Sequence, residues 1–165
     1  MLPRNSLLYS PVEAEQMRVD RITIFDGRLS FLIPHEWKQY DEDESYLYCV
    51  PNTESGWFRV TLAETQCFRE LPAEVLRGDF ANRQNVTQDT ETGNLVSAFE
   101  HDSEEEGQRI HVYYWVVANV VQTDLVRTAI FSYAVLTDCM LDGETKEMVS
   151  LITQNVTKSD FDPRS

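Results

Sequence analysis

The sequence is poor in the residues that mark disulfide-rich, metal-binding and loop-dominated proteins. It has 3 cysteines, 6 glycines and 6 prolines among 165 residues. The cysteines, Cys49, Cys67 and Cys139, are far apart, odd in number and form no Cys-x-x-Cys pair. This pattern argues against a disulfide framework or a zinc site, and reduced thiols in a cytosolic setting fit it best. We therefore expect a cytoplasmic protein.

Basic residues are scarce as well. The chain has 14 Lys and Arg against 28 Asp and Glu, which gives a formal net charge of −14. Nucleic acids and anionic membranes are bound through clustered Lys and Arg, so this charge argues against either as the main partner. The longest apolar run, 112–121, is interrupted by Asn119 and is too short to span a bilayer. Residues 1–10 lack an apolar core long enough for a secretory signal. We expect no nucleic-acid binding and no membrane insertion.

The motifs of common catalytic and cofactor sites are absent: there is no Gly-x-Gly-x-x-Gly, Gly-x-x-x-x-Gly-Lys, Gly-x-Ser-x-Gly or His-Glu-x-x-His. The histidines His35, His101 and His111 fit no standard metal-ligand spacing. His111 on an apolar strand is typical of a hydrogen-bonded core or half-core residue. Cys67 with His101 or His111 could form a nucleophile pair, but nothing local supports one. We expect a non-enzymatic protein without a cofactor or metal.

What the sequence does contain is one long apolar stretch, 108–136. Two runs rich in β-branched and aromatic residues flank a polar Gln-Thr-Asp, which predicts an antiparallel hairpin. Both faces of the first strand are apolar: Ile110 and Val112 begin one face, and His111 and Tyr113 begin the other. A half-exposed strand would alternate apolar with polar residues. We therefore expect layers that cover both faces of the sheet.

The remaining elements follow from local patterns. Alternating runs at 21–25 and 28–33 flank Asp26-Gly27 and predict a tight hairpin, with Pro34 ending its second strand and Trp37 covering its end. The other expected elements are strands at 46–50, 57–62 and 95–99; helices at 72–84 and 143–156, the latter capped by Asp142; a short helix or frayed arm at 10–17; and loops at 41–44, 85–94 and 100–106.

No repeat, linker or shift in composition marks a second domain. We expect an N-terminal arm or short helix over 1–18, a single α+β domain over 19–157, and a polar, disordered tail over 158–165 in which Phe161 can still dock. Strands that come as antiparallel neighbours, with helices between and after them, predict an antiparallel β-sheet with helices packed on both faces.

The segment 27–37 reads Gly-Arg-Leu-Ser-Phe-Leu-Ile-Pro-His-Glu-Trp, a strand that runs into a proline with a tryptophan shortly after. In this motif, and in element order over about 22–156, the chain resembles the PsbP-like fold group. That group includes the photosystem II extrinsic subunit, a Ran-binding import factor and adaptor chaperones of type VI secretion. The resemblance implies an antiparallel sheet between helices, a long late hairpin, a C-terminal helix, and a non-enzymatic role in binding other proteins.

Two modes of protein binding are open from the residues. Aromatic residues on predicted strands are either core or part of an apolar groove, and the candidates for a groove are Trp57, Tyr113 and Trp115. Alternatively the acidic runs, with Glu104, Glu105 and Glu106 as candidates, meet a basic surface. The first mode suits a bacterial adaptor or chaperone of a secretion system, and the second an immunity-like inhibitor.

Each mode has its own kind of partner. The expected partner is another protein, either basic or bearing an apolar segment, and a homodimer also stays open. The alternatives are a small-molecule-binding protein or enzyme with a pocket between sheet and helix, and a domain with only a structural role in a larger assembly.

Overall fold

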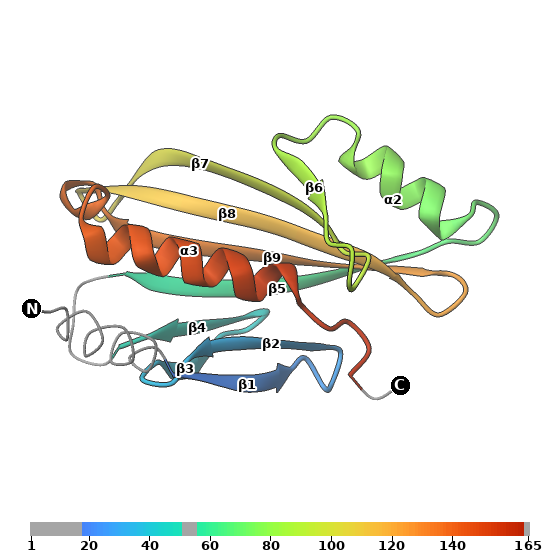
Figure 1. Ribbon diagram of the computed structural model, residues 1–165, viewed down its shortest axis with the longest axis horizontal. Helices are drawn as coiled ribbons and strands as arrows, with labels where there is room; N and C mark the ends of the chain where they lie inside the picture. Colours follow the sequence, from blue (N-terminus) through green and yellow to red (C-terminus); the bar gives the residue numbers. More distant parts are fainter. Residues whose placement is uncertain (1–17, 51–55, 164–165) are drawn as a thin grey trace, which may run out of the picture.

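The computed structural model describes residues 18–50 and 56–163 as one domain with two β-sheets and two α-helices (Figure 1). A two-stranded sheet holds β1 (Val19–Ile24) and β2 (Leu29–Pro34), and a seven-stranded sheet has the order β3-β4-β5-β9-β8-β7-β6, with every pairing antiparallel. The bounds of its strands are Lys38–Asp41 (β3), Ser45–Cys49 (β4), Trp57–Gln66 (β5), Val86–Gln88 (β6), Leu95–Glu105 (β7), Gln108–Val121 (β8) and Leu125–Leu136 (β9). The helices are α2 (Pro72–Phe80) and α3 (Gly143–Thr157), with a short 3₁₀ turn, η1 (Thr137–Cys139), before α3. The prediction of an α+β domain built on an antiparallel sheet is confirmed.

The predicted central hairpin is formed by β8 and β9, which pair from Ile110↔Leu136 to Val121↔Leu125. The polar turn between them starts at Gln122, whose φ is +62°. Strand β7 pairs along β8 from Leu95↔Ala118 to Glu105↔Gln108, so the three longest strands lie side by side. They set the geometry of the whole sheet.

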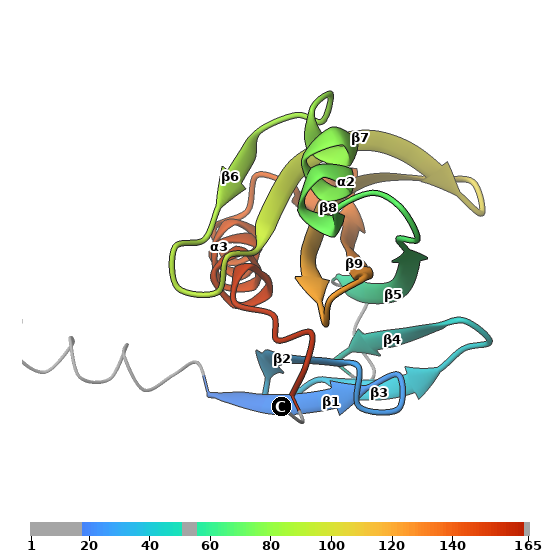
Figure 2. The ribbon, with the colours of Figure 1, turned by 90° about the vertical axis from the view of Figure 1, so that its right-hand side faces the viewer.

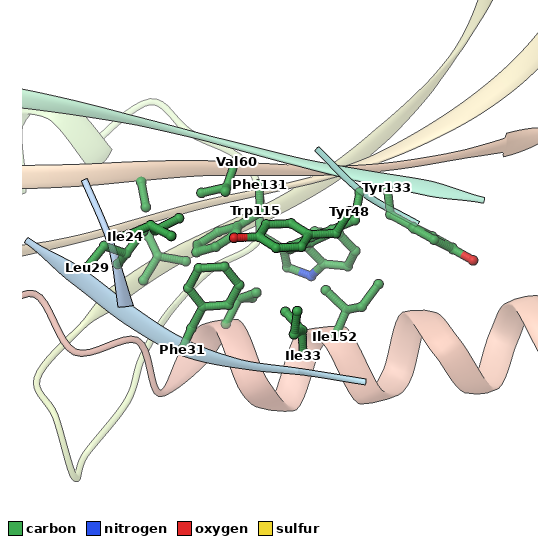
Figure 3. Packing of buried hydrophobic residues seen from close by; sticks show 14 of the residues in the cluster. Ile24, Leu29, Phe31, Ile33, Tyr48, Val60, Trp115, Phe131, Tyr133 and Ile152 are labelled. Atoms are coloured by element: carbon green, nitrogen blue, oxygen red, sulfur yellow. The ribbon is translucent and has the colours of Figure 1, made fainter. Parts of the chain in front are cut away.

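The main core lies where α3 and the β1–β2 hairpin pack on the sheet (Figures 1, 2 and 3). Phe31 of β2 meets Phe131 of β9 edge-on with ring centroids 5.1 Å apart, and Ile152 of α3 is buried in the same cluster. Trp37 stacks on Tyr133, 6.0 Å away. It therefore lies inside this core, together with Phe31 and Ile33 of the hairpin.

The alternate side chains of β8 and β9 belong to two smaller clusters. In one, Leu76 and Phe80 of α2 pack with Val116, Ala118 and Val126. In the other, Ile110, Val112 and Ala134 are buried, and Trp57, Tyr114 and Leu136 pack against them. Among the described residues, the helix that packs on the first of these clusters is α2.

Two turns differ from expectation. The acidic run 100–106 is not a loop: β7 continues to Glu105, and the turn is the two-residue Glu106-Gly107, whose φ angles of +51° and +82° suit a tight hairpin. Backbone pairing with 108–112 of β8 outweighs the crowding of like charges, because alternation sends successive side chains to opposite faces. Conversely, the turn at Asp26-Gly27 is not two residues long but spans Phe25 to Arg28.

Two further predicted boundaries move. The predicted loop at 85–94 contains β6, because Val86–Gln88 finds a partner in the first three residues of β7. The predicted helix at 72–84 ends at Phe80, and α3 begins after Asp142 as predicted, though no side-chain bond caps it.

The C-terminal segment packs on the domain as far as Pro163. Asp160 pairs with Ser30 of β2, Phe161 is buried in the main core, and buried Arg127 donates a hydrogen bond from Nη1 to the Phe161 carbonyl. Phe161 docks, and the prediction of a disordered tail is wrong for residues 158–163. The helix or arm predicted at 1–17 lies outside the described residues.

Candidate functional site

Strand β7 presents a long backbone edge. Strand β6 pairs only with Leu95–Ser97 of β7, and beyond that point no strand among the described residues lies on the side of β7 opposite β8 (Figure 1). Asn85 Nδ2 donates to the Ala98 carbonyl at 2.9 Å, so the Ala98 backbone points away from β8. Because strand residues alternate, the N–H and C=O groups of residues 100, 102 and 104 point the same way. An exposed edge of this kind is a template for pairing with another chain.

A pocket of about 310 Å³ opens beside this edge, at the N-terminal end of β6. Its wall includes Tyr113 and Trp115 of β8, with Val149 and Thr153 of α3 opposite. Trp115 is buried, and its Nε1 donates a hydrogen bond to Thr153 Oγ1 at 3.0 Å, which joins β8 to α3 at this pocket. Tyr113 stays partly exposed. The volume is at the lower end of the range for small-molecule sites and suits one large side chain.

His111 ties the acidic residues of β7 to the sheet. Its Nδ1 lies 2.8 Å from Asp102 Oδ1 and its Nε2 lies 2.8 Å from Glu100 Oε1, while its side chain is only 7% exposed. Burial lowers the pKa of His111, but hydrogen bonds to the two carboxylates raise it more, so the net shift is upward. The same contact lowers the pKa of Asp102. Both ring nitrogens lie within hydrogen-bond distance of a carboxylate, so the protonated ring donates to both acids. The prediction of a hydrogen-bonded half-core histidine is confirmed.

Five exposed carboxylates lie along this end of β7 and its turn: Glu100, Asp102, Glu104, Glu105 and Glu106. The first three share the face of His111, and Glu105 lies on the other. His101 also lies on that other face, where it stacks on Tyr114 with centroids 5.1 Å apart. Within 18–50 and 56–163, no group of three or more His, Cys, Asp or Glu is arranged to hold a metal ion.

The predicted groove residues are only partly brought together. Tyr113 and Trp115 line one pocket, but Trp57 pairs with Ala134 and lies on the opposite face, beside Tyr114 and Leu136. The register between paired strands decides which face of the sheet each side chain lies on. This register cannot be read from the sequence of one strand. Glu104–Glu106 continue the edge away from the pocket.

Sequence reasoning missed Glu100 and Asp102 as site residues and missed α3 as one wall of the pocket. The two acids could have been found from an acidic run beside an apolar strand that contains a histidine. The Thr153 wall carries no local signal, because it depends on how α3 docks.

A larger polar cleft of about 610 Å³ lies between β1, the end of β8 and residues 158–163. Its main polar groups are already bonded to one another. Asn94 Nδ2 donates to the carbonyls of Thr157 and Ser159, and Asn119 Nδ2 donates to Asn94 Oδ1 at 2.8 Å. Lys158 Nζ pairs with Asp89 Oδ1 at 2.5 Å and with Glu91. These contacts hold the C-terminal segment in place, so the cleft is best explained as structural.

No protein-family model and no curated protein matches the chain. It is similar to a solved structure of a Bacteroides thetaiotaomicron VPI-5482 protein, at 14% identity and a TM-score of 0.55 over 88% of this chain and 49% of that one. The chain thus spans about half the length of that protein. It is also similar to LpqN of Mycobacterium tuberculosis, described as involved in cell envelope biogenesis, at 13% identity and a TM-score of 0.51 over 93% and 95% of the two chains. At these identities the likeness shows the fold alone.

Proposed function

We propose that this protein is a non-enzymatic protein-binding domain that holds an extended segment of a partner along β7, beyond the end of β6. The observation that carries the proposal is the backbone of residues 100, 102 and 104, which points away from β8 and has no strand partner within 18–50 and 56–163, next to the Tyr113 pocket. An added strand takes its affinity from main-chain hydrogen bonds to such an edge and its specificity from pockets for alternate side chains. Here the pocket between Tyr113 and Val149 receives one side chain.

Among protein-binding roles, an adaptor or chaperone of a bacterial secretion system is the one we favour over an immunity-like inhibitor. Holding an extended client segment is what an adaptor does, and the groove residues Tyr113 and Trp115 line the pocket beside the edge that would hold it. We also propose that α2 and α3 are layers on opposite faces of the sheet, as in the PsbP-like fold group. Support comes from their packing on alternate residues: α2 on Val116, and α3 on Trp115.

We propose a cytoplasmic location on the basis of Cys49, Cys67 and Cys139, all of which are free thiols. In the described ranges, neither helix has the length and apolar character needed to cross a membrane. The likeness to LpqN, a protein of cell envelope biogenesis, makes the envelope the competing location. Fractionation of cells that produce the tagged full chain separates the two.

The alternative function, a small-molecule or enzyme site between sheet and helix, has less support. Ile152 and Val156 of α3 are buried in the core against the sheet, and the pocket beside Val149 and Thr153 is at the lower end of the volume range for small-molecule sites.

The test is a selection of binding peptides from a random library displayed against the full chain, followed by amide hydrogen exchange measured by NMR on the complex. Selected peptides should slow exchange at Glu100, Asp102 and Glu104, whose N–H groups point outward. Glu104→Pro removes one outward donor without breaking the β7–β8 ladder, because edge strands tolerate proline. It should abolish binding while leaving the urea midpoint of unfolding close to that of Glu104→Gln, the matched control.

A second pair of variants separates the two faces of the sheet. Tyr113→Ala should weaken peptide binding by about 2 kcal/mol, as truncation of an aromatic at a binding hot spot does. Trp57→Ala on the opposite face should leave affinity unchanged. Binding that survives Glu104→Pro, or that depends on Trp57 and not on Tyr113, would overturn the proposal.

A further inference from the structure

We infer that the partner segment is a cationic extended strand: one apolar side chain for the pocket, then Lys or Arg at two-residue spacing. This inference rests on the proposed function and specifies its partner. It is carried by the placement of charges along the same edge that offers the unpaired backbone.

Side chains along the edge decide which strand can pair there. An added strand places each of its residues about 5 Å from the residue opposite, where opposite charges attract and like charges destabilise the pair. On the face of His111, the edge presents Glu100, Asp102 and Glu104, and on the other face it presents Glu105. Basic residues at alternate positions of the partner therefore meet carboxylates on the pocket side of the sheet.

Nearby basic groups do not cancel this acidity. Arg109 pairs with Glu104 in the register of β7 and β8, and His111 is shared between Glu100 and Asp102. His101, on the other face, stacks on Tyr114. Arg59 also interacts with the charge of Glu105, but it is already bonded to Glu42. With Glu105 and Glu106 included, five carboxylates face Arg109 and the two histidines. The excess is negative over the whole pH range in which the carboxylates are ionised, and the net charge of −14 adds long-range attraction for a cation.

The same charges argue against a second copy of this chain as the occupant. Antiparallel pairing of two β7 edges would set Glu100, Asp102 and Glu104 of one copy against those of the other. Like-charged edge strands are a known means of preventing such pairing. The edge therefore disfavours pairing with a second copy and favours pairing with a strand of opposite charge. This argues against the homodimer, one of the alternatives that the sequence allowed.

The pocket fixes where along the segment the apolar residue falls. It lies at the Ala98 end of the free edge, whereas Asp102 and Glu104 lie toward the turn. The segment thus places its apolar residue near Ala98 and its basic residues opposite Asp102 and Glu104. A purely basic segment leaves the pocket empty, and a purely apolar one leaves the acids without partners.

The experiment measures binding of synthetic labelled peptides to the full chain by fluorescence anisotropy, at low and high salt. The peptides share a β-prone alternating sequence with one Phe and differ at two alternate positions, which are Lys, Gln or Glu. The Lys peptide should bind about fivefold to tenfold more tightly than the Gln peptide, as two cross-strand ion pairs allow. The Glu peptide should not bind, and added salt should remove most of the Lys preference.

Charge reversal provides the matched control. The double variant Glu104→Lys, Glu105→Lys reverses the charge of one of the two acids opposite the alternate positions and should lose the preference for the Lys peptide. The variant Glu36→Lys, Glu44→Lys makes the same change in net charge at exposed positions away from the edge and should keep the preference for Lys. If the two double variants show the same preference between the Lys and Glu peptides, net charge alone explains the selectivity and the inference is overturned.

The outcomes also separate the inference from the function on which it rests. If the Gln peptide binds as tightly as the Lys peptide and Glu104→Pro abolishes both, strand addition stands and the cationic partner is wrong. If Glu104→Pro changes the binding of no peptide, both are wrong. Self-association of the chain that Glu104→Pro removes would show that the occupant is a second copy and would likewise overturn the inference.

Discussion

The two edges of the main sheet are built in opposite ways. Strand β3 forms one edge with four residues, Lys38–Asp41, which are all exposed. Strand β7 forms most of the other edge, and beyond its contact with β6 it runs on to Glu105 as part of an eleven-residue strand. Short edge strands resist pairing simply because they offer few hydrogen bonds. A long edge needs another form of protection.

The difference shows why acidic residues accumulate on β7 and not on β3. Strand β3 carries a lysine, a glutamine and a tyrosine before Asp41, so its side chains are of mixed character. From Glu100 to Glu105, β7 alternates carboxylates with His101 and Ser103 and holds two of the carboxylates on His111. The charge on the long edge both prevents pairing with itself and, by our proposal, selects the strand that can pair.

The largest expected effect comes from removing that protection. Glu104→Val, Glu105→Val leaves the outward backbone groups in place and makes the free edge β-prone and apolar, which favours edge-to-edge pairing. We expect species larger than those of the wild type, measured by multi-angle light scattering and by thioflavin fluorescence. The matched change on the short edge, Lys38→Val, Gln39→Val, should leave the mass unchanged. Equal aggregation in both double variants would mean that strand length is not what distinguishes the edges.

The comparison also marks what could be predicted from the sequence. The β8–β9 hairpin and α3 could be predicted because β-branched runs around a polar turn, and a one-sided helical stripe, are local signals. The strand at 100–105 could not, because glutamate and aspartate disfavour strands and the pairing that imposes one comes from β8.

The candidate site was predictable only in part for the same reason. Tyr113 and Trp115 could be picked out as aromatic residues two apart on one strand, which therefore share a face. Whether Trp57 shares that face depends on the Trp57↔Ala134 register between β5 and β9, which the sequence of one strand does not contain. The wall formed by Val149 depends on the docking of a helix that follows β8 by more than twenty residues.

An intermediate effect is expected from His111, which fastens the long edge to the sheet. Its pKa is raised in the folded state, so its contribution to stability is fully present below the unfolded value of about 6.5 and is lost as pH rises through the folded pKa. His111→Gln should lower the free energy of unfolding by about 1 kcal/mol at pH 6, a modest amount because both carboxylates are more than half exposed. The difference between variant and wild type should shrink toward pH 9, as measured by urea unfolding at the two pH values. A difference that stays constant or grows with pH would show that the histidine is not held as an imidazolium.

The smallest effect is expected at the short edge, where an ion pair does the fastening. Arg59 Nε donates to Glu42 Oε1 at 2.9 Å, and this bond lowers the pKa of Glu42. Both side chains are about one-third exposed, so Glu42→Gln should cost only a few tenths of a kcal/mol. Because arginine stays charged and the carboxylate is ionised well below neutrality, the cost should be the same at pH 6 and pH 9 in urea unfolding. A loss of unfolding free energy that depends on pH as strongly as the loss expected for His111→Gln would contradict this. It would mean that the two edges do not differ in the pH dependence of the contacts that hold them.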